Sequence, residues 1–136
     1  MELKIVIAQY NFCVGDLEGN TEKIIELARK AKSKEEADLT IFPELAITGY
    51  PPEDLILRPG FHDRVSKCLT RIISALESET IILGYPELIG DKIFNSAGVI
   101  GKNQWITSYQ SKNFQTMLFL MKKDIFQPET SRQYLN

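Results

Sequence analysis

The sequence predicts an α/β domain, in which helices pack on a largely parallel sheet. Two short segments, residues 3–9 and 37–42, have mostly apolar residues on both faces, as strands do in a sheet that is covered on both sides. A segment with helical spacing separates them. A strand, a helix and a strand in this order form a βαβ unit, so we expect the two strands to be parallel.

The first helix is expected to begin near Asn20 or Thr21, because both residues are favoured N-caps. The apolar residues that follow recur at intervals of three and four, the spacing that gives a helix one apolar face. They are Ile24, Leu27, Ala28 and Ala31.

The clearest helix of the chain is predicted over residues 61–76, where apolar residues keep helical spacing for four turns. A third strand is predicted at 80–84, followed by a turn at 86–92. Two further strands are expected at 95–100 and 105–109, and the Gly-Lys-Asn-Gln between them is typical of a hairpin.

Composition and charge exclude several classes of protein. The 136 residues are 43% hydrophobic and 25% charged with a net charge of −2, which suits one soluble globular domain. The sequence contains no cluster of Lys or Arg that would indicate nucleic-acid binding. It also contains no apolar run long enough to span a membrane. With two cysteines and no signal peptide at its start, the chain is expected to be cytoplasmic with free thiols.

Residues 40–55 contain the main candidate for chemistry. A predicted strand ends, Glu44 follows, and a Gly/Pro turn comes next. A carboxylate at the carboxyl end of a strand lies where α/β sheets place their ligand-binding crevice, so Glu44 is a candidate general base. From position alone an ordinary surface acid in a loop is the more common case, because most acids lie in loops. Glu53 and Asp54 are expected to be first-turn acids of a short helix.

The other reactive side chains have weaker surroundings. Cys68 falls on the apolar face of the second helix and is expected to be a core residue. Cys13 lies in a loop without a neighbouring histidine to activate it. His62 is the only histidine, so no metal site is expected. Gly15 and Gly19 fit turns and not a phosphate-binding loop.

Several short motifs together resemble the nitrilase (carbon–nitrogen hydrolase) superfamily. They follow the family's order and spacing over residues 3–109. They are Ile7-Ala-Gln9, Val14-Gly-Asp16, Gly19-Asn20, Ala37-Asp38, Phe42-Pro-Glu-Leu45, Thr48-Gly-Tyr50, Gly84-Tyr-Pro-Glu87 and Phe94-Asn-Ser-Ala97. The longer string over residues 48–59 resembles, more narrowly, the N-terminal glutaminase domain of the glutamine-dependent NAD synthetases.

The resemblance implies an αββα sandwich and a Glu–Lys–Cys triad. In that family the Glu is the general base for the Cys thiol, the Cys attacks the amide carbon, and the Lys stabilises the oxyanion. Glu44 matches the family's Glu. The implied substrate is a small amide, glutamine, with no cofactor in this domain. ATP and deamido-NAD would belong to a separate synthetase domain that receives the ammonia, and the family is homo-oligomeric.

The resemblance stops after Tyr109. The family continues with a pattern like Tyr-His-Lys-x-x-Leu-Pro-Asn-Tyr, which residues 110–126 do not contain. With permitted codons, one base restored within codon 110 makes this stretch read Tyr-His-Lys-Gln-Lys-Leu-Pro-Asn-Tyr. We therefore expect a partial glutaminase-like domain at 1–109 and an out-of-frame tail at 110–136.

This break has chemical consequences for residues 1–136. The family's Lys should stand near position 111, which is Ser111 here. Lys112 is a candidate one residue out of register, and such a slip normally turns a side chain to the other face of the sheet. Neither Cys13 nor Cys68 matches the nucleophile. The expected product is the N-terminal half of the sandwich, inactive by itself.

Two alternative functions remain open. One is another nitrilase-family amidase, of the ω-amidase or carbamoylase type, against which the narrower string over residues 48–59 argues. The other is a non-catalytic fragment that pairs with an intact copy through its exposed sheet edge.

Overall fold

The computed structural model describes residues 2–113, with the backbone alone for residues 111–113. Eight elements follow one another along the chain. They are β1 (Ile5–Ile7), α1 (Leu17–Glu35), β2 (Leu39–Ile41), the 3₁₀ helix η1 (Glu53–Leu57), α2 (Phe61–Ala75), β3 (Thr80–Ile89), β4 (Lys92–Gly101) and β5 (Gln104–Asn113).

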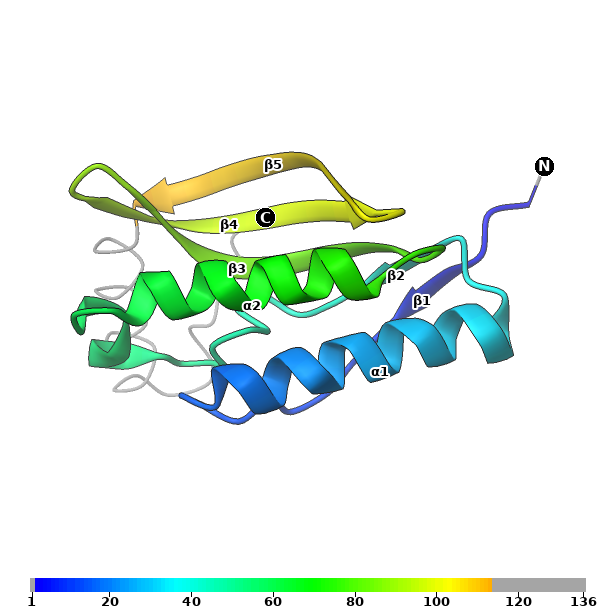
Figure 1. Cartoon of the computed structure of the whole chain (residues 1–136), viewed down its shortest axis with the longest axis horizontal. Helices are drawn as coiled ribbons and strands as arrows, with labels where there is room; N and C mark the ends of the chain where they lie inside the picture. The colour runs from blue at the N-terminus through cyan, green and yellow to red at the C-terminus, as the bar shows by residue number, and fades with distance from the viewer. Residues whose placement is uncertain (1, 114–136) are drawn as a thin grey trace, which may run out of the picture.

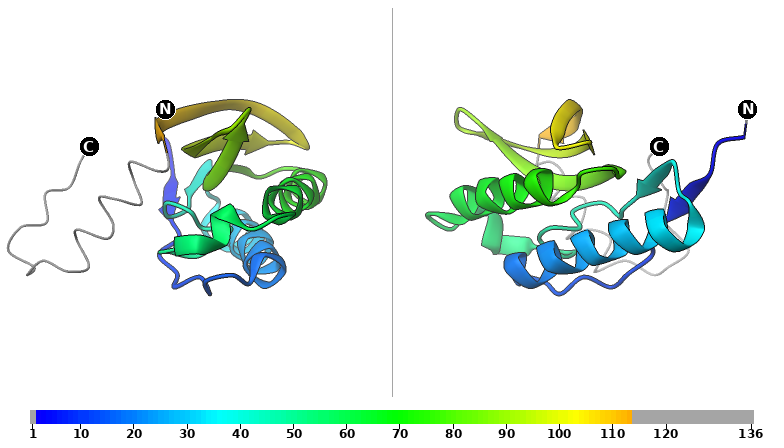
Figure 2. Two further views of the ribbon diagram at one scale, coloured as in Figure 1. Left: turned by 90° about the vertical axis from the view of Figure 1, so that its left-hand side faces the viewer. Right: turned by 45° about the vertical axis from the view of Figure 1, so that its right-hand side comes forward.

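The strands form one mixed sheet in the order β1-β2-β3-β4-β5. Strand β2 pairs in parallel with β1 and β3, whereas β4 pairs antiparallel with β3 and β5. The predicted βαβ unit and its parallel strands are therefore confirmed. Helices α1 and α2 lie side by side on one face of the sheet (Figures 1 and 2), so the described residues provide one helix layer and one sheet of an α/β fold.

Helix α1 begins a full turn earlier than expected. The predicted caps Asn20 and Thr21 are both buried within the helix. The cap is Asp16, whose carboxylate accepts a hydrogen bond from the backbone N–H of Gly19 at 3.1 Å. The prediction was wrong because Asn20 is used for a tertiary contact, described below, and not for capping.

Strand β3 is longer than predicted, since the expected turn at 86–92 is mostly strand. Pro86 lies inside β3 opposite Asn95 of β4. Proline has no N–H to donate, but β2 pairs with β3 only as far as Ile82, so this part of β3 has a partner on one side and tolerates the missing donor. The hairpin between β4 and β5 is confirmed, and Lys102 and Asn103 have the positive φ values of a two-residue turn.

The core lies between the helices and the sheet. It is built from fully buried aliphatic side chains of both layers: Ile24 and Ala28 of α1, Ile72 of α2, and Ile81, Leu83 and Ile100 of the sheet. Helix α2 matches its prediction closely, and Cys68 is buried on it as expected.

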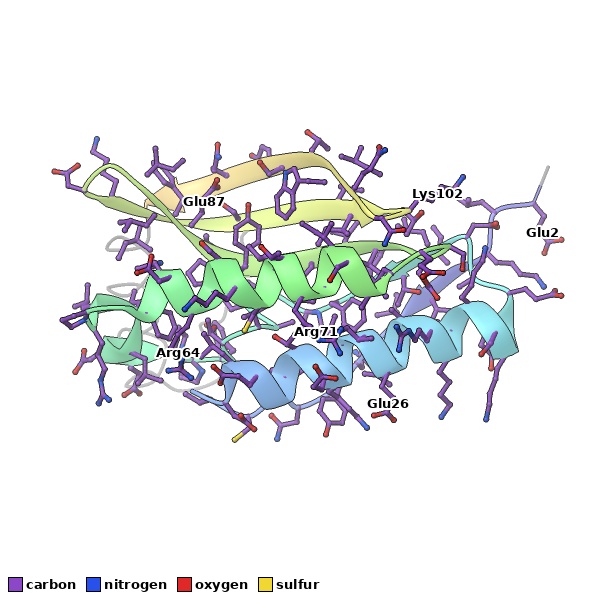
Figure 3. All side chains as sticks on the ribbon, in the orientation of Figure 1. Glu2, Glu26, Arg64, Arg71, Glu87 and Lys102 are labelled. Atoms are coloured by element: carbon purple, nitrogen blue, oxygen red, sulfur yellow. The ribbon has the colours of Figure 1, made fainter. Side chains whose placement is uncertain are left out.

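Two exposed ion pairs join the helices on their solvent side. Arg64 binds Glu18 at 2.9 Å and Arg71 binds Glu22 at 3.2 Å, and Figure 3 shows both arginines on the side of α2 that faces α1. Hydrogen bonding from Arg64 lowers the pKa of Glu18. These pairs fix the relative position of the helices more than they add stability, because exposed pairs are screened by water.

The second face of the sheet carries apolar residues from all five strands and is covered by no helix among residues 2–113. Cross-strand pairs link Ile7 with Ile41, Ile41 with Ile82, and Ile82 with Val99. Ile7 is 69% exposed and Tyr109, on the same face, is 70% exposed. Within the described residues, no helix is long and apolar enough to cross a membrane.

The boundary predicted after residue 109 does not coincide with the end of an element, because β5 continues to Asn113. The rest of the predicted out-of-frame tail lies outside the described residues.

Candidate active site

Glu44 follows directly on the last hydrogen bond that ties β2 to β3. The backbone N–H of Phe42 donates to the carbonyl of Ile82 at 2.9 Å. The chain then leaves the sheet through Pro43, and the side chain of Glu44 is exposed. The structure therefore places Glu44 at the carboxyl end of a parallel strand, as the sequence predicts.

Gly84 of β3 allows the Glu44 segment to pass close to the sheet. A Cβ atom at Gly84 would lie 2.5 Å from the backbone N of Leu45 and 2.9 Å from both Glu44 Cα and the carbonyl oxygen of Pro43. These neighbours are backbone atoms, which cannot move aside as a flexible side chain can. Glycine at position 84 therefore lets the backbone of residues 43–45 lie against β3, and this contact sets the position of the Glu44 carboxylate.

The turn after Glu44 holds a strained residue. Leu45 has φ +54°, in the left-handed region that leucine rarely adopts, at a cost of about 1 kcal/mol or more. It is completely buried, and its carbonyl lies 3.2 Å from the hydroxyl of Thr48. Burial and this contact hold the strained backbone in place next to the candidate base, a placement common at functional sites.

Asn20 joins this turn to the loop that precedes α1. Its side-chain oxygen accepts from the N–H of Cys13 at 2.9 Å, and its amide donates to the carbonyls of Cys13 at 2.7 Å and Ile47 at 2.9 Å. The side chain is only 3% exposed. One buried amide thus satisfies three backbone groups from two loops and fixes the segment that carries Glu44.

Replacing Asn20 with alanine is expected to lower the free energy of unfolding by about 2 kcal/mol, because buried backbone groups lose their partners. Urea denaturation followed by circular dichroism measures the loss. The exposed variant Thr70→Ala removes a single hydroxyl bond on α2 and should change stability by less than about 0.5 kcal/mol. Equal effects of the two substitutions would contradict the clamping role of Asn20.

The Glu44 carboxylate has a partner in the sheet. The side-chain amide of Asn95, on β4, donates a hydrogen bond to Glu44 Oε1. Beside this pair lies a pocket of about 150 Å³, large enough for a small polar group of a substrate. It is lined by Phe42, Pro43, Glu44, Ile82, Gly84, Asn95, Ser96, Ala97 and Tyr109.

The other reactive side chains considered in the sequence do not line the pocket beside Glu44. The pocket lining includes neither cysteine. Cys13 is exposed in its loop, and Cys68 lies in the core, where burial raises the pKa of its thiol. His62 Nε2 lies 2.8 Å from the carbonyl of Ile56. Among residues 2–113, no group of three or more potential ligands could hold a metal ion.

Lys112 stands opposite Asn95 in the pairing of β5 with β4. Its side chain lies outside the described part of the structure, so the backbone register alone places it. Glu53 and Asp54 lie in η1, the short helix expected there.

A second carboxylate in the sheet, Glu87, lies on the opposite face, toward α2 (Figure 3). It accepts hydrogen bonds from the hydroxyl of Ser96 at 2.7 Å and the amide of Gln110 at 2.9 Å. Burial, together with the charge of Glu87, raises the pKa of neighbouring Tyr85 to about 12. Glu87 is therefore part of a polar network under the helix layer and is separate from the Glu44 pocket.

Comparison with known proteins identifies close relatives. The Carbon-nitrogen hydrolase family matches residues 4–133. The chain is 41% identical over 110 residues to the glutamine-dependent NAD(+) synthetase of Xanthomonas campestris, covering 81% of this chain and 20% of that protein. It is 36% identical over 132 residues to the synthetase of Xylella fastidiosa, covering 96% of this chain and 24% of that one.

Solved structures share the fold. The glutamine-dependent NAD+ synthetase of Acinetobacter baumannii superposes with a TM-score of 0.76 at 37% identity, over 82% of this chain and 21% of that one. An amidase from Nesterenkonia, at 21% identity, has the same fold with a TM-score of 0.71, over 80% of this chain and 42% of its own. The chain thus spans about a fifth to a quarter of the synthetases and under half of the amidase. On this evidence the chain belongs to the carbon–nitrogen hydrolase family.

Proposed function

We propose that this domain derives from an amide hydrolase that releases ammonia from glutamine, with Glu44 as its general base. The observation that carries the proposal is the seated carboxylate, which lies at a strand end, beside a pocket, with an amide donor on one of its oxygens. The similarity to glutamine-dependent NAD(+) synthetases supports glutamine as the substrate.

In the proposed reaction Glu44 accepts the proton of a cysteine thiol. The resulting thiolate attacks the amide carbon, and Glu44 returns the proton to the amide nitrogen. The carbon–nitrogen bond then breaks, and ammonia leaves while a thioester forms. Water, activated by the same carboxylate, then hydrolyses the thioester and frees the thiol. A lysine ammonium stabilises the oxyanion of each tetrahedral intermediate.

Residues 1–136 are proposed to be inactive by themselves. Cys13 and Cys68 both lie away from the Glu44 pocket, so the covalent route lacks its nucleophile. No cofactor is proposed for this domain, and ATP and deamido-NAD would belong to a synthetase domain that uses the ammonia. We also propose that residues 110–136 are out of frame, which sequencing of the gene around codon 110 tests directly.

Two other functions have some support. The fold shared with the Nesterenkonia amidase is compatible with an amidase of ω-amidase or carbamoylase type. The uncovered apolar face of the sheet, which includes Ile7 and Tyr109, is compatible with a non-catalytic fragment that pairs with an intact copy.

Ammonia release distinguishes these possibilities. The 136-residue chain is compared with a version whose frame is restored and which continues to the length of its relatives, each supplied with glutamine or with a panel of amide and carbamoyl substrates. We expect release from glutamine by the restored protein only, with a loss on the order of 10⁴-fold or more in the 136-residue chain. Glutamine hydrolysis by the 136-residue chain, or a restored protein that prefers other amides, would overturn the proposal.

A further inference from the structure

A second pocket, which we call the α2 pocket, lies between α2 and the sheet, on the face opposite the Glu44 pocket. Its volume is about 520 Å³, within the range of sites that hold small molecules. Among the described residues, no member of its lining also lines the Glu44 pocket, so the proposed function does not use it. Its lining includes Asp63, Leu69 and Ile73 of α2 and Tyr85, Glu87 and Trp105 of the sheet.

Two aromatic rings of the sheet contribute to the α2 pocket. Tyr85 is buried and Trp105 is 37% exposed, and their rings meet edge to face with centroids 5.5 Å apart. A Cβ atom at Gly98 of β4 would lie 2.9 Å from Cζ2 and 3.0 Å from Cζ3 of the indole, so glycine there leaves room for the Trp105 ring to lie against β4. Aromatic rings placed in this way attract cations.

The charge of the α2 pocket is negative. Its described lining contains two acidic residues, Asp63 and Glu87, and neither lysine nor arginine. Arg64 and Arg71 of α2 are turned toward α1, where they bind glutamates of that helix (Figure 3). The two hydrogen bonds that Glu87 accepts both fall on Oε2. An ionised carboxylate can accept about four, so Glu87 has capacity for a further donor.

We propose that the α2 pocket binds a small organic cation, an ammonium on a short apolar stem. The ammonium donates to Glu87 and lies against the indole of Trp105, while the stem packs on Leu69 and Ile73. The two carboxylates repel an anion. An inorganic cation fits less well, because among residues 2–113 no three potential metal ligands are grouped. Binding at this site needs neither Glu44 nor turnover, so it stands apart from the proposed function.

The fluorescence of Trp105 tests the proposal in the 136-residue chain. Trp105 is the only tryptophan of the sequence, so its emission reports on the α2 pocket alone. The chain is titrated at low salt with three probes of equal carbon number, pentylammonium, 1-pentanol and pentanoate. We expect a saturable change with pentylammonium and binding of the other two that is weaker by about tenfold or more, because they lack the cation.

Three outcomes of the titration would overturn the proposal. They are the absence of a saturable response to pentylammonium, a response to 1-pentanol or pentanoate at the same concentrations, and an indole emission that urea does not shift. The last result would mean that Trp105 does not occupy the folded pocket.

Charge-removing variants locate the bound cation. We expect Glu87→Gln to weaken pentylammonium binding by about tenfold or more. Asp63→Asn changes an exposed residue and so leaves the fold intact; it should weaken binding by about threefold. The matched control Glu26→Gln, exposed on α1 (Figure 3), should change it by less than about twofold. Parent-like binding by Asp63→Asn, or by Glu87→Gln with a native circular dichroism spectrum, would contradict the assignment.

Discussion

Replacing Gly84 with valine is expected to lower the free energy of unfolding by about 3 kcal/mol, the upper part of the usual range for overpacking. Valine favours strands, so the change costs nothing in local preference. The cost arises because the new Cβ would lie 2.5 Å from the backbone N of Leu45 and 2.9 Å from Glu44 Cα. The segment that carries Glu44 must move away from the sheet to relieve this contact.

Urea denaturation of the 136-residue chain measures the change. The matched control is Gly90→Ala in the turn between β3 and β4, where nothing lies within 4 Å of the added Cβ but φ is +62°. Its expected cost, from the left-handed backbone alone, is about 1 kcal/mol. If Gly84→Val costs no more than Gly90→Ala, the close approach that seats Glu44 does not exist in solution.

The parts of the fold that depend on local patterns were predicted well. Helix α2, the parallel pairing of β1 with β2, the β4–β5 hairpin and the position of Glu44 at a strand end all follow from the spacing of apolar residues and from turn residues within one segment. Each needs only the pattern of one element or of elements that follow one another in the chain, as the strand–helix–strand order does for β1 and β2.

The features that escaped prediction depend on residues far apart in the chain. Asp16 caps α1 because Asn20 is occupied by backbone groups of two loops. Pro86 is accepted in β3 because β2 has already ended. Asn95 stands in a recognised motif, but its hydrogen bond to Glu44, 51 residues away, follows only from strand register.

The pairing of β4 with β5 also skips Ser111, since Ser96 pairs with Gln110 and Asn95 with Lys112. A regular strand, in which side chains alternate between the two faces of the sheet, predicts no such irregularity. Register is a property of two strands together, so no inspection of residues 104–113 by themselves would have revealed it.

The largest effect is expected from removing the charge of Glu44 in the frame-restored protein. The substitution Glu44→Gln puts an amide in place of the carboxylate and keeps the size of the side chain. The amide cannot accept the thiol proton. Removing the general base from a set of catalytic residues that act together reduces kcat by several orders of magnitude. Glu53→Gln, at an exposed residue of η1, is the matched control because it makes the same chemical change outside the pocket.

The initial rate of ammonia release from saturating glutamine, compared between these two variants and the restored parent, tests the central claim that Glu44 is the base of an amide-hydrolysing site. We predict a fall in kcat on the order of 10³-fold to 10⁴-fold for Glu44→Gln and a change of less than about twofold for Glu53→Gln. Comparable kcat values for Glu44→Gln and the parent would contradict the account.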